Sequence, residues 1–124
     1  MYKRFKYWFY GILVGILAAL GYTIWAVDNS LEWTNPTTFT DGSTIPVGDL
    51  VSVRIFRKVG QGAYSLYQTI PINTQYVDTN QNNGTYCYQV AVVRFNGIQS
   101  GLSNEACRTV DTRIPNVPTV LSVN

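Results

Sequence analysis

Histidine is absent from the 124-residue sequence, and its absence sets the first limit on the chemistry available to the chain. Imidazole is the commonest general base and the commonest metal ligand in proteins, so both roles lack their usual residue. The sequence also shows no nucleophile paired with a base and no glycine-rich phosphate loop. We therefore expect a protein that is not an enzyme and that has no catalytic residue, no cofactor and no metal site.

Two carboxylates, Asp41 and Asp49, share one turn-rich loop at residues 37–49, an arrangement that calcium sites also use. Because Asp41 precedes a glycine, and Asp-Gly pairs are common in turns, turn formation explains these residues better than metal binding. Asn83-Gly84-Thr85 matches the acceptor sequence for N-glycosylation, but it is also an ordinary turn. Neither pattern predicts a functional site.

The two cysteines, Cys87 and Cys107, lie symmetrically about Gly97. The Asn-Gly pair at this point is the strongest hairpin signal in the chain, and residues equally distant from a hairpin turn face each other. An even cysteine count indicates a disulfide in an oxidising compartment. We expect a cross-strand disulfide, with two free thiols as the alternative. It should lie on the face opposite Tyr86 and Tyr88, outside the core.

Short strand-like runs fill the chain after residue 30. In the clearest of them, Val51, Val53 and Ile55 share one face and alternate with residues of the other face. No helical period is seen in this part of the chain, and most of the runs end at glycine, proline or asparagine. An antiparallel β-sandwich is predicted. The expected strands cover residues 31–34, 50–58, 64–70, 74–78, 86–93 and 106–110.

Residues 31–110 resemble a fibronectin type III domain of the bacterial or phage kind. The resemblance rests on the order and spacing of Leu31-x-Trp33-x-x-Pro36, Tyr76-x-Asp78, Gly84-Thr85-Tyr86-Cys87-Tyr88-Gln89-Val90 and Ser103-Asn104-Glu105-x-Cys107. It implies an immunoglobulin-like sandwich with Trp33 as the core tryptophan of strand B. It also implies that Tyr86 begins strand F and that the cysteines lie on strands F and G. Membership of this family fixes a fold and says little about activity.

The segment from Tyr7 to Ala26 contains no charged residue and has aromatic residues near both ends. About 20 apolar residues in a helix cross the hydrocarbon core of a bilayer. We therefore predict a transmembrane α-helix over residues 7–26, a basic cytoplasmic N-terminus at 1–6 and a linker at 27–30. Lys3, Arg4 and Lys6 precede the segment, which predicts a cytoplasmic N-terminus and an extracytoplasmic domain, at a periplasmic, cell or virion surface. A cleaved signal peptide and a buried soluble helix are the alternatives.

Small residues lie four positions apart in the predicted span, at Gly11, Gly15 and Ala19. On a helix they would share one face, which lets a second helix approach closely. Chance is the alternative, because glycine and alanine are common in such helices. The pattern favours contact with another membrane subunit.

The charge of the chain is unevenly distributed. The net formal charge is +2, but residues after Ala26 carry six basic and seven acidic side chains. Such a surface does not attract a phosphate backbone, so nucleic-acid binding is not expected. The expected partners are membrane lipid and other protein subunits, in a homo- or hetero-oligomer.

The predicted helix ends at residue 26 and strand B begins at residue 31, so the strand A of a fibronectin type III domain has no room between them. The edge of strand B is then open and can accept another strand. The tail at residues 111–124 resembles the proline-rich lead and strand A of such a domain. We expect it to add to a sheet edge, in its own or a neighbouring chain, through Val117, Thr119, Val120, Leu121 and Val123. A tail without fixed structure is the alternative.

Two functions follow as hypotheses. The first is a non-enzymatic structural or accessory subunit of a larger assembly, held in the membrane by a single span. The second is an adhesion or recognition module that binds a protein or glycan through its distal loops. In the second case Phe39, Phe95 and Ile98 would supply the apolar contacts. Ordinary loop packing is the alternative for these three residues, and it is the simpler explanation.

Overall fold

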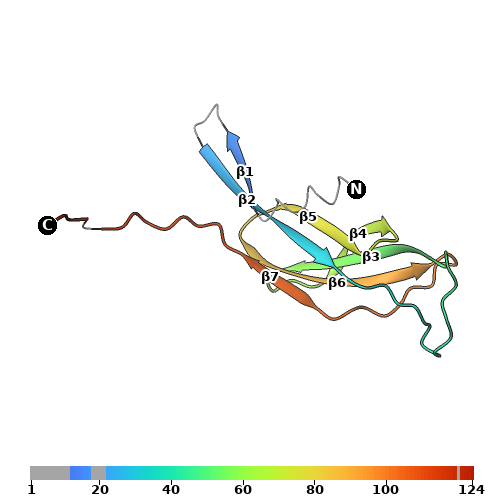
Figure 1. The fold of residues 1–124 in the computed structure, drawn as a ribbon. Helices are drawn as coiled ribbons and strands as arrows, with labels where there is room; N and C mark the ends of the chain where they lie inside the picture. Colours follow the sequence, from blue (N-terminus) through green and yellow to red (C-terminus); the bar gives the residue numbers. More distant parts are fainter. Residues whose placement is uncertain (1–11, 18–21, 120) are drawn as a thin grey trace.

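The structure is a computed structural model that describes residues 12–17, 22–119 and 121–124, and these residues form two antiparallel β-sheets (Figure 1). One sheet has the order β1-β2-β5 and the other has the order β4-β3-β6-β7. The predicted all-β fold with two antiparallel sheets is confirmed. The strands are β1 (Ile12–Leu17), β2 (Tyr22–Glu32), β3 (Leu50–Val59), β4 (Ser65–Pro71), β5 (Gln75–Gln81), β6 (Gly84–Arg94) and β7 (Ala106–Val110).

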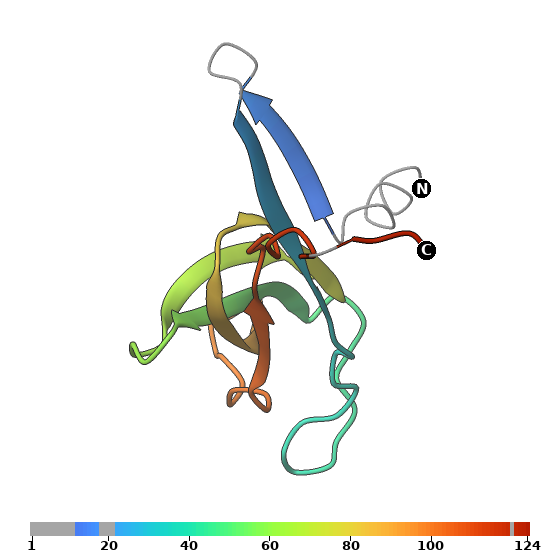
Figure 2. The same ribbon diagram turned by 90° about the vertical axis from the view of Figure 1, so that its left-hand side faces the viewer.

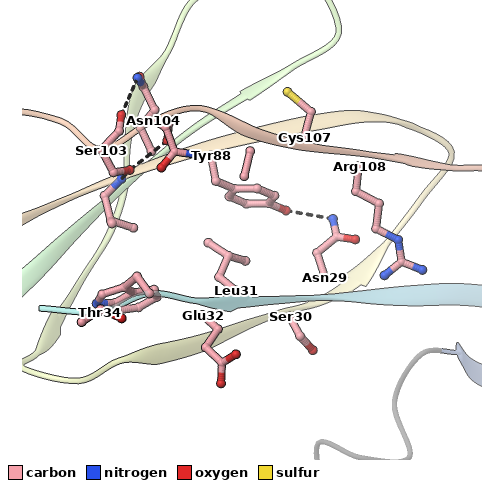
Figure 3. Close-up of a pocket in the computed structure, with 14 residues that line it drawn as sticks. Asn29, Ser30, Leu31, Glu32, Thr34, Tyr88, Ser103, Asn104, Cys107 and Arg108 are labelled. Atoms are coloured by element: carbon pink, nitrogen blue, oxygen red, sulfur yellow. Dashed lines mark hydrogen bonds between the residues drawn. The ribbon is translucent and has the colours of Figure 1, made fainter.

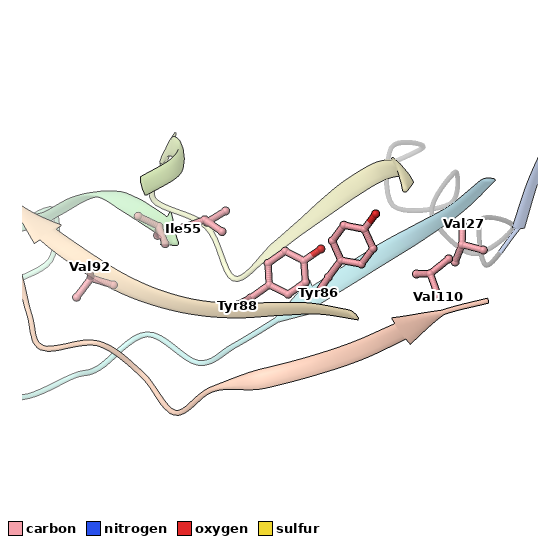
Figure 4. Close-up of a cluster of buried hydrophobic side chains, with 7 residues drawn as sticks. Val27, Ile55, Tyr86, Tyr88, Val92 and Val110 are labelled. Carbon is pink, nitrogen blue, oxygen red and sulfur yellow. The ribbon is translucent and has the colours of Figure 1, made fainter. Parts of the chain in front are cut away.

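The core lies between the two sheets (Figure 4). Alternation along β3 sends Val53 and Ile55 inward, and neither has any exposed surface. From β6, Tyr86, Tyr88 and Val92 point to the same side and are also buried. The sandwich is therefore built mainly on the paired central strands β3 and β6, which run in register from Ser52↔Val93 to Val59↔Tyr86.

The connection from β6 to β7 contains the predicted turn and an irregular return. Gly97 has a φ of 89°, a left-handed value that glycine adopts without steric cost, and its N–H donates to the Arg94 carbonyl at 2.8 Å. On the return, the hydroxyls of Ser100 and Ser103 accept hydrogen bonds from the backbone N–H groups of Val92 and Val90, each at 3.0 Å. Side chains thus replace part of the β-ladder before β7 begins.

The N-terminal region differs from the prediction. A helix over 7–26 was expected, but β1 pairs antiparallel with residues 22–27 of β2. The pairing runs from Ile12↔Val27 to Leu17↔Tyr22. Residues 1–11 and 18–21 lie outside the described residues. The prediction and the structure differ because β2 is one continuous strand, which begins at residue 22 in this region and continues into the sandwich. Among the described residues, no helix is long and apolar enough to cross a membrane.

The expected linker at 27–30 is also corrected. These residues belong to β2, and Val27, Asp28 and Asn29 are buried. The antiparallel ladder between β2 and β5 reaches Val27↔Gln81, and the ladder has an irregularity between Val27 and Asn29. Pairing with β5 and packing against β6 therefore hold this segment inside the sandwich, where a hydrated connection was expected.

The two ends of the sandwich differ (Figure 1). We call the end where β2 enters and β7 ends the near end, and the opposite end the far end. The β1–β2 hairpin and the C-terminal tail both leave from the near end. Figure 2 shows the hairpin projecting beyond the body of the two sheets. At the far end, the loop before β3 and the turn after β6 lie together. The near end therefore carries the most apolar segment of the sequence, and the far end carries the longest loop.

Candidate functional site: an open groove between the sheets

The two sheets meet along two seams, and the seam between β4 and β5 is closed by a buried carboxylate. Asp78 of β5 is 1% exposed and accepts hydrogen bonds from residues of the opposite sheet. Arg57 donates to its Oδ2 at 2.9 Å, Tyr88 donates to Oδ2 at 2.6 Å and Tyr67 donates to Oδ1 at 2.6 Å. Gln81 also donates to Oδ1, at 3.0 Å. The buried charge is therefore paired and saturated with donors, as burial in a protein requires.

The tyrosines of this seam are held in their neutral form. Burial, together with the hydrogen bond to Asp78, raises the pKa of Tyr67 to about 12. The same two causes raise the pKa of Tyr88. The guanidinium of Arg57 lies 3.8 Å from the centre of the Tyr67 ring and adds a cation–π contact. These interactions bind the two sheets together at this seam.

The opposite seam, between β2 and β7, is a groove of about 630 Å³ (Figure 3). Its floor includes Leu31 of β2 and Tyr88 and Val90 of β6, and Ala106 of β7 lies on its other side. Towards the near end, Arg108 reaches across from β7 and donates to the backbone oxygen of Asp28 at 3.0 Å. No strand among the described residues covers the groove.

Asn29 stands at the side of this groove with half of its amide unpaired. Its Nδ2 donates to the Tyr88 hydroxyl at 2.8 Å, which connects the groove to the Asp78 network. Its Oδ1 is buried and has no hydrogen-bond partner among the described residues. An unpaired buried acceptor costs about 1–3 kcal/mol. This unpaired atom lies buried at the side of the groove.

The outer edge of β2 is open along the groove. The N–H of Trp33 donates to the backbone oxygen of Thr74 at 2.9 Å, on the β5 side. Backbone N–H and C=O groups alternate in direction along a strand, so residues two and four positions before Trp33 also direct these groups towards β5. The N–H and C=O groups of Ser30 and Glu32 then point to the other edge. β1 pairs only with residues 22–27 of β2, and no described strand pairs with Ser30 or Glu32 on this side.

The C-terminal tail forms no strand in the described residues. Its apolar side chains Ile114, Val117, Leu121 and Val123 are between 73% and 98% exposed. Thr119 is exposed, and Val120 lies outside the described residues. Before the tail, Thr112 donates to Asn83 Oδ1 from its N–H at 2.8 Å and from its hydroxyl at 2.7 Å. These bonds fix the start of the tail against the turn between β5 and β6.

The predicted disulfide is confirmed. Cys87 and Cys107 are directly opposite in the β6–β7 register and are bonded. Neither belongs to the hydrophobic core cluster, and Cys107 is exposed while Cys87 is buried. Glu105 lies close enough to the two sulfur atoms to suggest a metal site, the one such group among the described residues. Because both sulfur atoms are in the disulfide, no thiolate is present to bind a metal.

The three aromatic and apolar residues expected in the distal loops lie at the far end. The guanidinium of Arg94 lies near two of them, 4.5 Å from the ring centre of Phe39 and 5.9 Å from that of Phe95. Arg94 is itself held by the buried carboxylate of Asp49 at 2.7 Å and 3.1 Å. Phe95 and Ile98 are 68% and 58% exposed, whereas Phe39 is half-buried.

The three residues singled out for helix packing lie in or beside the β1–β2 region of the sequence, and their packing role stays a prediction. Gly15 lies in β1 opposite Ile24, and Gly11 and Ala19 lie outside the described residues. The groove residues Asn29 and Arg108 were not expected from the sequence. Asn29 was assigned to a linker, and its contact with Tyr88 joins residues far apart in the chain, which no local pattern indicates.

Comparison with known proteins gives no relative: no protein-family model, no curated protein and no solved structure matches this chain.

Proposed function

We propose that this chain is a non-enzymatic, membrane-anchored structural or accessory subunit of a larger assembly, with its β-sandwich outside the membrane. The observation that carries the proposal is the uncharged run from Tyr7 to Ala26, which follows three basic residues and includes the first part of β2. Its length is sufficient to cross the hydrocarbon core, and the preceding basic residues favour a cytoplasmic N-terminus.

The proposed span is helical when it is inside a bilayer. In hydrocarbon every backbone N–H and C=O needs a partner, and a two-stranded hairpin leaves the outer edges of both strands unpaired. A helix satisfies these groups within the segment. Insertion therefore exchanges the β1–β2 pairing for helix, and Gly11, Gly15 and Ala19 then share one face that can contact another span.

The disulfide supports an extracytoplasmic position for the sandwich. Disulfides persist in oxidising compartments and are rare in the cytosol. The Cys87–Cys107 bond lies in β6 and β7, on the C-terminal side of the proposed span. A single crossing with the N-terminus inside delivers both cysteines to the oxidising side.

We also propose that the sandwich is of the fibronectin type III kind. Tyr86, at the start of β6, donates from its hydroxyl to the Asn82 carbonyl at 2.8 Å. This contact is similar to the tyrosine corner of immunoglobulin-like domains, in which a tyrosine near the start of strand F bonds to backbone a few residues upstream. Trp33 packs against the core from the end of β2, as the resemblance implies.

An incomplete sandwich edge favours a subunit over a free-standing receptor. Exposed edges with unpaired backbone groups invite addition of another strand, and natural proteins usually protect them. Here the edge at Ser30 and Glu32 adjoins the 630 Å³ groove. A neighbouring chain in an assembly would cover it.

Alkaline extraction tests the anchor. The full chain is expressed in cells, and the membranes are washed at high pH, which releases peripheral proteins. We expect the chain to stay in the pellet and external protease to reach the sandwich only from the outer side. A Val14→Lys, Leu17→Glu variant should be released, because each charge at the centre of a span costs about 2.5–3.5 kcal/mol. Release of the unaltered chain would contradict the anchor.

Recognition through the far end is the second candidate function. Phe95 and Ile98 expose most of their apolar surface beside Arg94, on loops held by a rigid sandwich. Purification from membranes in mild detergent distinguishes the two functions. An assembly subunit co-purifies with stoichiometric chains, whereas a free-standing recognition module purifies alone and loses its ligand on Phe95→Ala.

A further inference from the structure

We propose that the groove between β2 and β7 is an acceptor site for the C-terminal tail of a second copy of this chain. The tail segment 114–124 would lie along β2, with apolar side chains in the groove. The inference rests on the proposed role as a subunit and adds to it the partner, the acceptor residues and the donor segment.

The acceptor has two features that a strand would satisfy together. The outward N–H and C=O groups of Ser30 and Glu32 provide a backbone ladder. Leu31 and Val90 provide a partly buried apolar floor. The unpaired Oδ1 of Asn29 lies beside this floor but is buried, so it adds no exposed acceptor to the edge. Figure 3 shows Asn29 and Leu31 pointing into the groove while Ser30 and Glu32 point away from it.

The tail has the composition of the missing strand. Residues 114–124 contain no charged side chain, so no side-chain charge has to be desolvated beside an apolar floor. In an extended chain Val117, Thr119, Leu121 and Val123 share one face, and three of the four are apolar. The described residues of this face are exposed in the isolated chain. Burying them gives the tail a reason to leave solvent.

The tail of the same copy is directed away from its own groove. The two hydrogen bonds from Thr112 to Asn83 hold residue 112 at the near end. Arg113 then binds Asp111 through both side chains, with Nη2 to Oδ2 at 2.6 Å and Nε to Oδ1 at 2.8 Å. From there the tail continues away from the sandwich (Figure 1). Entry into its own groove needs a reversal of the chain at this point, so the groove of the same copy stays open to the tail of a second copy.

Binding of the tail as a separate peptide tests the acceptor. A fluorescent peptide of residues 114–124 is titrated into the chain lacking these residues, in mild detergent. We expect saturable binding. Ala106→Arg, which places a long side chain in the groove, should weaken it by at least about tenfold. Thr109→Arg on the outer face of β7 is the matched control and should change it by less than about twofold. Circular dichroism and the intact disulfide show that each variant is folded.

The donor face is tested in the peptide itself. Leu121→Asp should reduce binding by at least about tenfold, while Ser122→Asp, on the other face, should have a much smaller effect. Excess peptide should also reduce the size of the assembly formed by the full chain. Absence of binding, equal binding by the Leu121→Asp peptide, or an assembly unchanged by bound peptide would each overturn the inference. The proposed membrane subunit would survive that result if alkaline extraction still leaves the chain in the membrane.

Discussion

The two seams of the sandwich differ in how they join the two sheets. At the β4–β5 seam, Asp78 collects donors from Arg57, Tyr67 and Tyr88, and the sheets are joined by a satisfied buried network. At the β2–β7 seam, Arg108 makes one bond across to the Asp28 carbonyl, and the remaining length is a groove. The first seam is complete within one chain. The second has outward backbone groups on β2 that another strand would pair with.

This difference separates stability from assembly. Because the closed seam holds the sheets together, the open seam does not have to contribute to folding of the single chain. Its residues are then available for contact with a partner. Changes at the closed seam should lower the free energy of unfolding, whereas changes at the open seam should alter association and leave folding nearly unaffected.

The largest expected effect is from Asp78→Ala. Removing one partner of a buried ion pair leaves Arg57 and two tyrosine hydroxyls without their acceptor, which costs about 3–5 kcal/mol. Urea denaturation of the full chain in mild detergent, monitored by tryptophan fluorescence, measures the loss in the free energy of unfolding. Asp111→Ala, which removes an ion pair in which both side chains are exposed, is the control and should leave the midpoint nearly unchanged. Equal losses in the two variants would remove the distinction between the seams.

The disulfide should have the next largest effect. Replacing Cys87 and Cys107 together by serine should lower the free energy of unfolding by about 2 kcal/mol, at the low end for disulfides, because the two strands are already paired by the ladder. Faster amide exchange in β7 should accompany the loss. A variant whose β7 amides exchange as slowly as before would show that the ladder alone holds this edge.

High pH should open the closed seam selectively. The pKa of Tyr67 is raised in the folded state to about 12 from an ordinary value near 10. Its contribution to stability is therefore fully present below pH 10 and is lost as the pH rises towards 12. The midpoint of urea denaturation should fall over this range, and Tyr67→Phe should make the fall smaller. An identical pH profile in Tyr67→Phe would exclude this tyrosine as the cause.

The smallest effect on folding is expected at the open edge. Glu32→Lys places a charge of opposite sign on the outward face of β2, and surface changes of this kind usually stay within about 0.5 kcal/mol. The same urea titration measures it. A loss comparable to that of Asp78→Ala would mean that the open seam contributes to folding after all.

The sandwich was predictable where local pattern and structure agree. Alternating residues marked β3, and the symmetry of Cys87 and Cys107 about a glycine turn gave the register of β6 with β7. β2 was not predictable in the same way. Asp28 and Asn29 looked like a hydrated linker, but both are buried. The bond from Asn29 to Tyr88 joins residues 59 positions apart, so no local window contains its cause.

The N-terminal run shows a different limit. A predominantly apolar sequence satisfies the requirements of a membrane helix and of a strand, because it has no charged residue to fix the period. Trp33 lies directly after β2 and is partly buried against the core, and the resemblance gave no information on how Ser30 and Glu32 are covered. The groove became visible only when the edges of both sheets were in place.

Amide exchange at Ser30 and Glu32 tests the central claim most directly. The full chain and the chain lacking residues 114–124 are compared in proteoliposomes at high protein density, with residue-level mass spectrometry. Tail donation predicts that both amides exchange at least about tenfold more slowly in the full chain, and that dilution of the protein in the membrane removes this protection. Equal exchange rates in the two chains at high density would contradict the claim that a second copy closes the open edge.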